Sequence, residues 1–292
     1  MRRTPPPDIR EVKAIEDYRE RFYVDPHKKL KLEKLDPAYT GEHESEADAA
    51  PETAHYLRRL CDLQGVFSAD GRWALLIVLQ GLDAAGKDGT VAHVMSAFSP
   101  QSASVSAFKV PTVEERAHDF LWRVHPHAPA KGSIAIFNRS HYEDFLVPAV
   151  HRTLDEEACL KRIKDIRAFE KLLFHAGTRI VKFFLHIGKR EQLDRFAHRL
   201  DDPSRNWKIS ESDYTERAYW DDYIEAYDDV LRATSTEHAP WYVIPADRKW
   251  FRNLAVSQIV SGAIEDLHPR YPKPSVDLDE IRRRYHEEAA AE

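Results

Sequence analysis

Residues 81–87 constrain the fold of this chain more than any other segment. They read GLDAAGK, follow the apolar run WALLIVLQ at 73–80, and precede apolar residues at helical spacing over 91–98. The pattern G-x-x-x-x-G-K between a strand and a helix is typical of a phosphate-binding loop, because glycines let backbone N–H groups turn towards phosphate oxygens. The alternative is a glycine-rich turn that binds no ligand. The predicted phosphate contacts in this loop are Gly81, Ala84, Ala85, Gly86, Lys87, Asp88 and Gly89.

Further apolar runs indicate the other strands of a parallel sheet. They lie at 133–138, 179–187 and 241–247, and helical patterns separate them. Continuous apolar runs are typical of strands that are buried on both faces, and alternating strands and helices indicate βαβ units. We therefore predict one doubly wound α/β domain with three layers. One of its helices should begin with a capping box at Thr153 and Glu156 and end at Gly177.

Composition sets the domain limits and excludes several functions. We predict an N-terminal arm over 1–50, the main domain over 51–270, and a charged tail over 271–292. The net charge of −6 argues against a polycation that binds nucleic acid or membranes. The spacing of Cys61 and Cys159 fits neither a metal site nor a disulfide framework. No leader segment and no apolar run of about 18 residues is recognised, so we expect a soluble cytoplasmic protein.

Two carboxylates depart from the usual phosphate loop. Asp88 stands where Ser or Thr commonly holds Mg²⁺, and Asp83 lies inside the loop itself. A bare carboxylate there would repel phosphate, so Asp83 should face a divalent cation or the transferred phosphoryl group. The alternative is that Asp83 caps the backbone of its own loop.

A second polar cluster, FNRSHYED at 137–144, comes directly after the run at 133–138. Ligands of open α/β sheets bind at the carboxyl ends of the strands, where this cluster should lie. Arg139 could bridge phosphate oxygens, while Glu143 and Asp144 could hold Mg²⁺. Asn138 takes a position where many phosphate-loop enzymes have an acidic metal ligand. The alternative is a solvated loop between a strand and a helix.

A basic run over 189–208 could form a lid over phosphates. Arg195 and Arg199 lie four residues apart and so share one face of a helix. The alternative is an ordinary solvated surface, and the aromatic residues over 213–232 are expected to serve packing rather than base stacking. Lys109 is a weaker candidate. The predicted phosphate-binding cations outside the loop are Lys109, Arg190, Arg195, Arg199 and Lys208.

Several segments together resemble the family-2 polyphosphate kinases over residues 50–270. They are GLDAAGKDG, SAFKVPT, HDFLWR, FNRSHYED, DDPSRNWK and PWYVIPADRKW. The resemblance implies a P-loop kinase fold similar to thymidylate kinase, with a helical lid over about 189–232. It also implies Mg²⁺-dependent phosphoryl transfer between inorganic polyphosphate and nucleotides. The expected catalytic residues are Asp83, Lys87, Arg139, Glu143 and Asp144, with Asp83 and Asp144 as metal ligands.

The second motif resembles the class III type, which accepts both AMP and ADP. Diphosphate-specific members tend to read D-R-S-W-Y-N-R, whereas this chain reads N-R-S-H-Y-E-D over 138–144. We therefore expect reversible conversion of AMP to ADP and of ADP to ATP, with Mg²⁺ or Mn²⁺, guanine nucleotides as further acceptors, and a homo-oligomer. The alternatives are an ATP-dependent nucleoside or nucleoside-monophosphate kinase and a non-catalytic nucleotide-binding module.

Overall fold

The sheet is parallel throughout, in the computed structural model that describes residues 16–291. Its strands follow the order β2-β3-β1-β4-β5. Their bounds are Ala74–Gln80 (β1), Ala103–Ala107 (β2), Ile134–Asn138 (β3), Thr178–His186 (β4) and Trp241–Pro245 (β5). Because β1 pairs in parallel with both β3 and β4, the carboxyl ends of these three strands lie at the same end of the sheet. The segments that we predict to carry the chemistry follow these strand ends.

Four of the strands were predicted from their apolar runs, and β2 was not. Strands β1, β3, β4 and β5 are almost entirely buried, which explains why each reads as continuous apolar sequence. Strand β2 reads ASVSA, lies at the edge of the sheet, and has no fully buried residue. An exposed edge strand needs no apolar run, so the sequence carries no such signal there.

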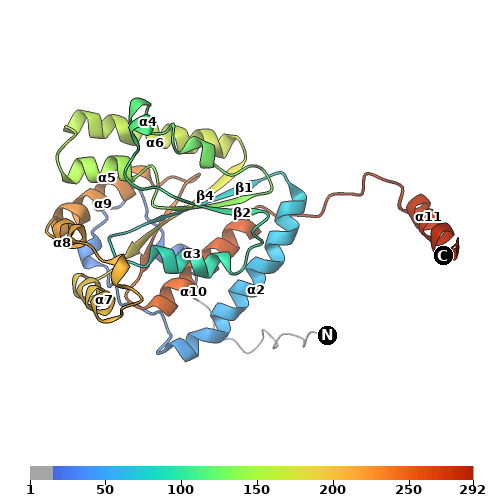
Figure 1. The fold of residues 1–292 in the computed structure, drawn as a ribbon, viewed down its shortest axis with the longest axis horizontal. Coiled ribbons are helices and arrows are strands. Elements are labelled where there is room, and N and C mark those ends of the chain that lie inside the picture. Colours follow the sequence, from blue (N-terminus) through green and yellow to red (C-terminus); the bar gives the residue numbers. More distant parts are fainter. Residues whose placement is uncertain (1–15, 292) are drawn as a thin grey trace.

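Helices cover both faces of the sheet and make three layers (Figure 1). Helices α2, α3 and α10 cover one face, whereas α5, α6 and α9 cover the other (Figure 1). The longer helices are Glu46–Asp70 (α2), Lys87–Met95 (α3), Glu143–Val150 (α5), Glu156–His175 (α6), Lys189–Asp201 (α7), Trp220–Thr234 (α9), Lys249–Glu265 (α10) and Leu278–Ala291 (α11). The shorter ones are Tyr18–Phe22 (α1), Leu32–Lys34 (η2), Val113–Ala117 (α4), His125–His127 (η3), Asn206–Lys208 (η4) and Glu211–Arg217 (α8). The predicted three-layer α/β fold is confirmed.

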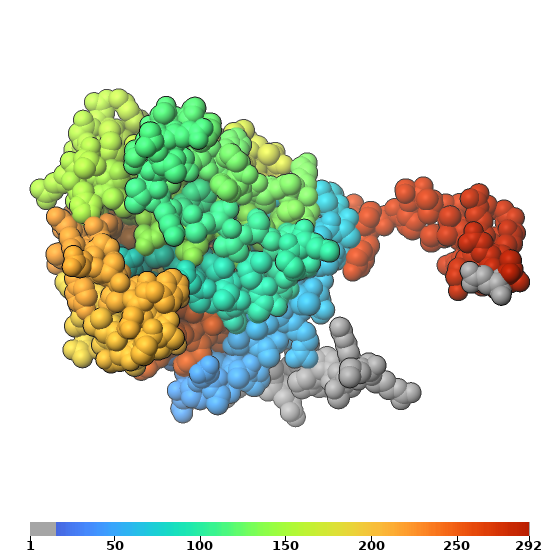
Figure 2. Space-filling view, in the orientation of Figure 1, coloured from blue at the N-terminus to red at the C-terminus, as the bar shows by residue number. Residues whose placement is uncertain are grey.

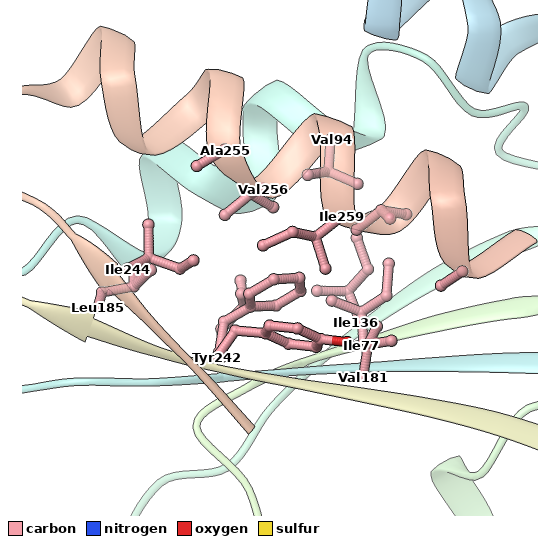
Figure 3. Packing of buried hydrophobic residues seen from close by; sticks show 14 of the residues in the cluster. Ile77, Val94, Ile136, Val181, Leu185, Tyr242, Ile244, Ala255, Val256 and Ile259 are labelled. Atoms are coloured by element: carbon pink, nitrogen blue, oxygen red, sulfur yellow. The ribbon is translucent and has the colours of Figure 1, made fainter. Parts of the chain in front are cut away.

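The core has two halves, because side chains alternate across the central strand. Leu75, Ile77 and Leu79 of β1 pack with α2, α3 and α10. Figure 3 shows Ile77 in this half of the core, with Val94 of α3 and Ile259 of α10. Leu76 and Val78 pack with α5, α6 and α9 on the other face. With both faces covered, the strands are held rigidly and give the loops at their carboxyl ends a fixed base.

The N-terminal part of the described chain packs onto the domain. The first fifteen residues of the predicted arm lie outside the described residues. Tyr18, Val24 and Leu32 are buried, and the predicted boundary at residue 50 falls inside α2. Helix α2 begins earlier because Ser45 caps it through the backbone N–H of Asp48. This segment therefore adds to the core rather than only covering it.

The helix predicted to begin at Thr153 begins two residues later. The side chain of Asp155, not that of Thr153, accepts a hydrogen bond from the N–H of Ala158, so the expected capping box is wrong. Gly177, which follows the helix, has φ of +96°, in agreement with the predicted left-handed end. Both Thr and Asp are good N-caps, so the local sequence did not decide between them.

The C-terminal segment has few contacts with the rest of the molecule. Helix α11 lies apart from the domain in Figure 1, and none of its described side chains is buried. Over residues 16–291, no helix combines the length and the apolar character that are needed to cross a membrane.

Candidate active site

The phosphate loop lies between β1 and α3, as predicted. Gly81 and Gly86 have φ of +155° and +103°, a range that side chains rarely adopt. A Cβ on Gly81 would lie 2.8 Å from the carbonyl oxygen of Leu185, and one on Gly86 would clash with the guanidinium of Arg252. Both positions therefore require glycine. The loop then enters α3, whose N-terminus carries the partial positive charge that favours phosphate.

Lys87 is buried at the base of this loop. Its Nζ donates to the carbonyl oxygens of Gly81, at 2.6 Å, and Leu82, at 3.2 Å. Burial and the neighbouring Arg139 lower the pKa of Lys87 to about 8, although Asp83 acts in the opposite direction. The ammonium is therefore still charged at pH 7, in a position with little water to screen it.

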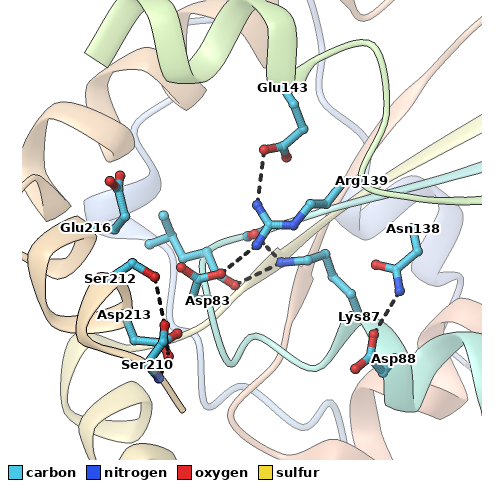
Figure 4. Close-up of polar contacts among 12 residues, drawn as sticks. Asp83, Lys87, Asp88, Asn138, Arg139, Glu143, Ser210, Ser212, Asp213 and Glu216 are labelled. Atoms are coloured by element: carbon cyan, nitrogen blue, oxygen red, sulfur yellow. Dashed lines mark hydrogen bonds and ion pairs between the residues drawn. The ribbon is translucent and has the colours of Figure 1, made fainter. Parts of the chain in front are cut away.

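Arg139 lies between two carboxylates beside the loop (Figure 4). Its Nη2 donates to Oδ1 of Asp83 at 2.7 Å, and its Nη1 donates to Oε2 of Glu143 at 3.0 Å. Burial by itself would raise the pKa of Asp83, but Lys87 and Arg139 outweigh that effect and lower it. Asp83 is therefore ionised. The structure thus joins the P-loop and the second motif through one guanidinium, at the carboxyl ends of the neighbouring strands β1 and β3.

The backbone of Arg139 is strained. Its φ of +61° lies in the left-handed region, and Ala84 in the P-loop has the same φ. Non-glycine residues held in this region cost about 1–3 kcal/mol and persist where the surroundings fix them. The backbone N–H of Arg139 donates to the carbonyl oxygen of Leu79 in β1 at 3.0 Å. This contact holds the start of the second motif against the strand that carries the P-loop.

Asp144 pairs with an arginine outside the second motif. Its carboxylate accepts a hydrogen bond from Nη2 of Arg123 at 2.7 Å, and Nη1 of Arg123 donates to the carbonyl oxygen of Lys109. The expectation was that Asp144 holds a metal ion together with Asp83; in the structure Asp144 pairs with Arg123, whereas Asp83 pairs with Arg139. Glu143 is the residue of this motif that reaches the guanidinium of Arg139. Lys109 contributes its carbonyl here, and its side chain is exposed.

Asp88 and Asn138 meet at the start of α3. The side-chain amide of Asn138 donates to Oδ1 of Asp88 at 2.8 Å, and Nζ of Lys208 lies 3.8 Å from its Oδ2 (Figure 4 shows the first pair). Asp88 and Asn138, which both replace the residues usual at their positions in phosphate-loop enzymes, are therefore hydrogen-bonded to each other. Lys208, predicted as a lid cation, reaches this end of the P-loop.

The two arginines predicted for the lid lie in different surroundings. Arg195 is buried and donates to the carbonyl oxygens of Ala84, Ala246 and Asp247, at 2.7–2.9 Å. The expectation was that Arg195 lies on an open phosphate-binding face; in the structure it is buried, and four of its five N–H groups have protein partners, one of them Glu191. It supports the P-loop instead.

Arg199 lies one turn further along α7 than Arg195. Its Nη1 donates to the carbonyl oxygen of Lys208 and lies 3.6 Å from Oδ1 of Asp213. Its charge helps to lower the pKa of Asp83, after the larger effects of burial, Lys87 and Arg139. Arg190 is largely exposed and pairs with Asp194. Arg199 is therefore a predicted lid cation whose charge acts on Asp83.

Helices α7 and α8 stand beside the P-loop. Figure 2 shows a hollow between the orange segment around α8 and α9 and the green segment around α4, with teal chain on its floor. Gln192 of α7 donates to the backbone oxygen of Asp83 at 2.9 Å, which fastens the segment to the loop. Of the aromatic residues over 213–232, Trp220 and Tyr227 are buried, as expected for packing residues, whereas Tyr214 and Tyr219 are exposed.

Arg252 is a site residue that sequence reasoning missed. Its buried guanidinium lies against Gly86 and Gly89, and its only side-chain partner among the described residues is Asn253. Burial and the charge of Arg195 lower the pKa of Arg252 to about 10. The available signal was its place in the segment DRKWFR after β5, which is also the carboxyl end of a strand.

The carboxylates here fit a metal ion that phosphates help to hold. No cluster of three or more His, Cys, Asp or Glu side chains that could bind a metal occurs within residues 16–291. Mg²⁺ commonly uses one or two carboxylates together with waters and substrate phosphates. Asp83 and Glu143 flank the guanidinium of Arg139 and are the two carboxylates beside the P-loop that could serve in this way.

Comparisons with known proteins agree with this geometry. The family model described as Polyphosphate kinase 2 matches residues 43–272. The AMP/ADP-polyphosphate phosphotransferase of Meiothermus ruber is 45% identical over 262 residues, which are 89% of this chain and 98% of that protein. The ADP-polyphosphate phosphotransferase of Rhodopseudomonas palustris is 43% identical, over 82% of this chain and 86% of that protein. A crystal structure of polyphosphate kinase 2 from Arthrobacter aurescens is 41% identical, with a TM-score of 0.90 over 94% of this chain and 99% of that one. The chain therefore belongs to the polyphosphate kinase 2 family.

Proposed function

We propose that the protein transfers the terminal phosphoryl group of inorganic polyphosphate to AMP and ADP, reversibly. The proposal rests mainly on one observation: the guanidinium of Arg139 lies between Asp83 and Glu143, beside the buried ammonium of Lys87. Two fixed cations at a phosphate loop suit a phosphoryl group, which is negatively charged in both the substrate and the product. The names of the relatives support polyphosphate and adenine nucleotides as the substrates.

The chemistry needs positioning and charge neutralisation rather than a covalent intermediate. The bond between the terminal phosphorus and its bridging oxygen breaks, and a bond forms to a phosphate oxygen of the acceptor. The shortened polyphosphate keeps the bridging oxygen as its new end. Lys87 and Arg139 are placed to offset the charge on the transferred phosphoryl group. The backbone N–H groups of the P-loop would hold the phosphate next to it in the chain.

A divalent cation completes the proposed charge balance. Mg²⁺, or Mn²⁺ in its place, would be held by Asp83 and Glu143 and by the substrate phosphates, and would neutralise phosphate oxygens. Without a cation, the carboxylate of Asp83 would repel phosphate in this loop, and a bound metal ion would remove that repulsion. Its lowered pKa keeps it ionised, which metal binding requires.

We expect AMP to be converted first to ADP and then to ATP by the same site. At the position where diphosphate-specific relatives tend to carry a cation, this chain has Asp144, and Arg123 neutralises it. This position therefore adds no positive charge that would require the acceptor to carry a second phosphate. In a time course with excess polyphosphate, ADP should rise and then fall as ATP accumulates.

The control for this experiment is an adenylate kinase inhibitor, because that activity would also produce ATP from ADP. Untouched AMP, with ADP still phosphorylated, would contradict the acceptor range. Turnover with ATP as the donor and none with polyphosphate would show a nucleotide-dependent kinase instead.

Arg199 should affect the polymer more than the nucleotide. Replacing it with alanine should raise KM for long-chain polyphosphate roughly tenfold, because a charge-assisted contact contributes about 1.5–3 kcal/mol, and should change KM for AMP less. Added salt should produce the same selective effect. Arg283→Ala on α11 removes the same charge from an exposed position and serves as the matched control. Equal increases in both KM values would place Arg199 at the acceptor.

A further inference from the structure

A fully buried ion pair lies beneath the second motif and has no part in the site described above. Lys182 of β4 and Glu170 of α6 have side-chain exposures of 0% and 1%, and Nζ lies 2.7 Å from Oε2. In the sheet, Lys182 is aligned with Val78, three residues before the P-loop begins. Burying two charges is costly in free energy, so the presence of this pair calls for an explanation.

The two charges share their remaining partners with the second motif. Nζ of Lys182 donates to the hydroxyl of Tyr142 and to the carbonyl oxygen of Thr234, both at 2.9 Å. Together with Glu170, these partners use all three donors of the ammonium. The Tyr142 hydroxyl donates to Oε1 of Glu170 at 2.8 Å. Nε2 of His141 lies 3.3 Å from the same oxygen. Burial alone would raise the pKa of Glu170, but Lys182 holds it below its ordinary value, so the carboxylate accepts from both residues.

The motif is therefore held from two sides. His141 and Tyr142 contact the buried pair, while Arg139 and Glu143, on either side of them in sequence, face the P-loop. The left-handed φ of Arg139 is unfavourable and must be fixed by its surroundings. A shift of His141 and Tyr142 would move both functional side chains together.

Stability alone does not account for the pair. Desolvating two charges costs several kcal/mol per ion, and apolar replacement of a buried pair is often neutral or stabilising. Catalytic groups, in contrast, lose about 100-fold in rate when they are misplaced by about 1 Å. We infer that Glu170 and Lys182 are positioning residues for phosphoryl transfer, which fix Arg139 and Glu143 through Tyr142 and His141. This inference rests on the proposed function.

The test is a variant that removes both charges and keeps the volume, Glu170→Met/Lys182→Met. We expect its melting temperature to stay near that of the wild type and its kcat with AMP and polyphosphate to fall about 10- to 100-fold. KM for polyphosphate should change little, because the P-loop is not altered. Glu170→Gln/Lys182→Met keeps an oxygen that accepts from Tyr142 and should recover part of kcat.

Two further variants complete the design. Tyr142→Phe removes only the hydroxyl and should lower kcat without a loss of fold, so the inference remains testable if the double variant does not fold. Glu157→Met/Lys161→Met removes an exposed pair from the same helix and should change neither kcat nor melting. Wild-type kcat in a stable double Met variant, or in Tyr142→Phe, would show that the pair is only structural. A wild-type protein without polyphosphate-dependent turnover would instead overturn the proposed function.

Discussion

Replacing Lys87 with alanine should lower kcat for phosphoryl transfer by about 100- to 1,000-fold, the loss that follows removal of one fixed transition-state donor. The ammonium is buried among the loop carbonyls, and its pKa of about 8 leaves it charged at pH 7. No other lysine of the described residues donates to the P-loop carbonyls. Steady-state kinetics with polyphosphate and AMP measure the effect.

The fold of the Lys87→Ala variant should persist, because the side chain packs against a loop rather than within the two halves of the core. Circular dichroism melting checks this expectation. Lys161→Ala on α6, an exposed lysine paired with Glu157, is the matched control and should retain full activity. A Lys87→Ala variant with near wild-type kcat would remove the P-loop cation from the mechanism.

The sequence predicted the sheet well because most strands are buried on both faces. Such strands leave continuous apolar runs, and Gly81 and Gly86 mark the loop where the backbone must turn. Strand β2 left no such run, since half-exposed edge positions accept Ser and Ala. The start of α6 was placed two residues early because Thr153 and Asp155 are both good caps, and only tertiary packing selects one.

Positions set by strand ends could be predicted from the sequence, whereas positions that depend on rotation about a helix could not. Asp83, Lys87 and Arg139 meet because β1 and β3 are neighbours in a parallel sheet. Glu143 and Asp144 are consecutive residues of α5, so they point in directions about 100° apart. The pattern could not tell which one faces the P-loop, and the structure selects Glu143.

The sequence also did not show which residues on one face of a helix are buried. Arg195 and Arg199 share a face of α7, yet the first is buried against the P-loop backbone and the second remains near solvent. The buried pair left one visible signal, since Lys182 interrupts the apolar run RIVKFFLHI. A charge inside a two-sided buried strand requires a partner, but its identity depends on how α6 packs.

Replacing Arg139 with alanine should have the largest effect, a loss in kcat on the order of 1,000-fold, comparable with the loss of a phosphate-clamping arginine in other phosphoryl transferases. The substitution removes a cation and also leaves two carboxylates, Asp83 and Glu143, without their shared partner. Their combined charge would then repel the donor. KM for polyphosphate should therefore rise together with the fall in kcat.

Two companion variants separate the causes of that loss. Arg139→Lys keeps the charge but cannot bridge two carboxylates in one plane, so its kcat should lie between those of wild type and Arg139→Ala. Arg139→Ala/Glu143→Gln removes one of the stranded carboxylates and should lower KM for polyphosphate relative to Arg139→Ala, without restoring kcat. If Arg139→Lys were fully active, the planar bridge would be unnecessary and Arg139 would act as a point charge. If the second substitution left KM unchanged, repulsion by Glu143 would not contribute to donor binding, and the ion pair seen beside the P-loop would serve only to orient Arg139.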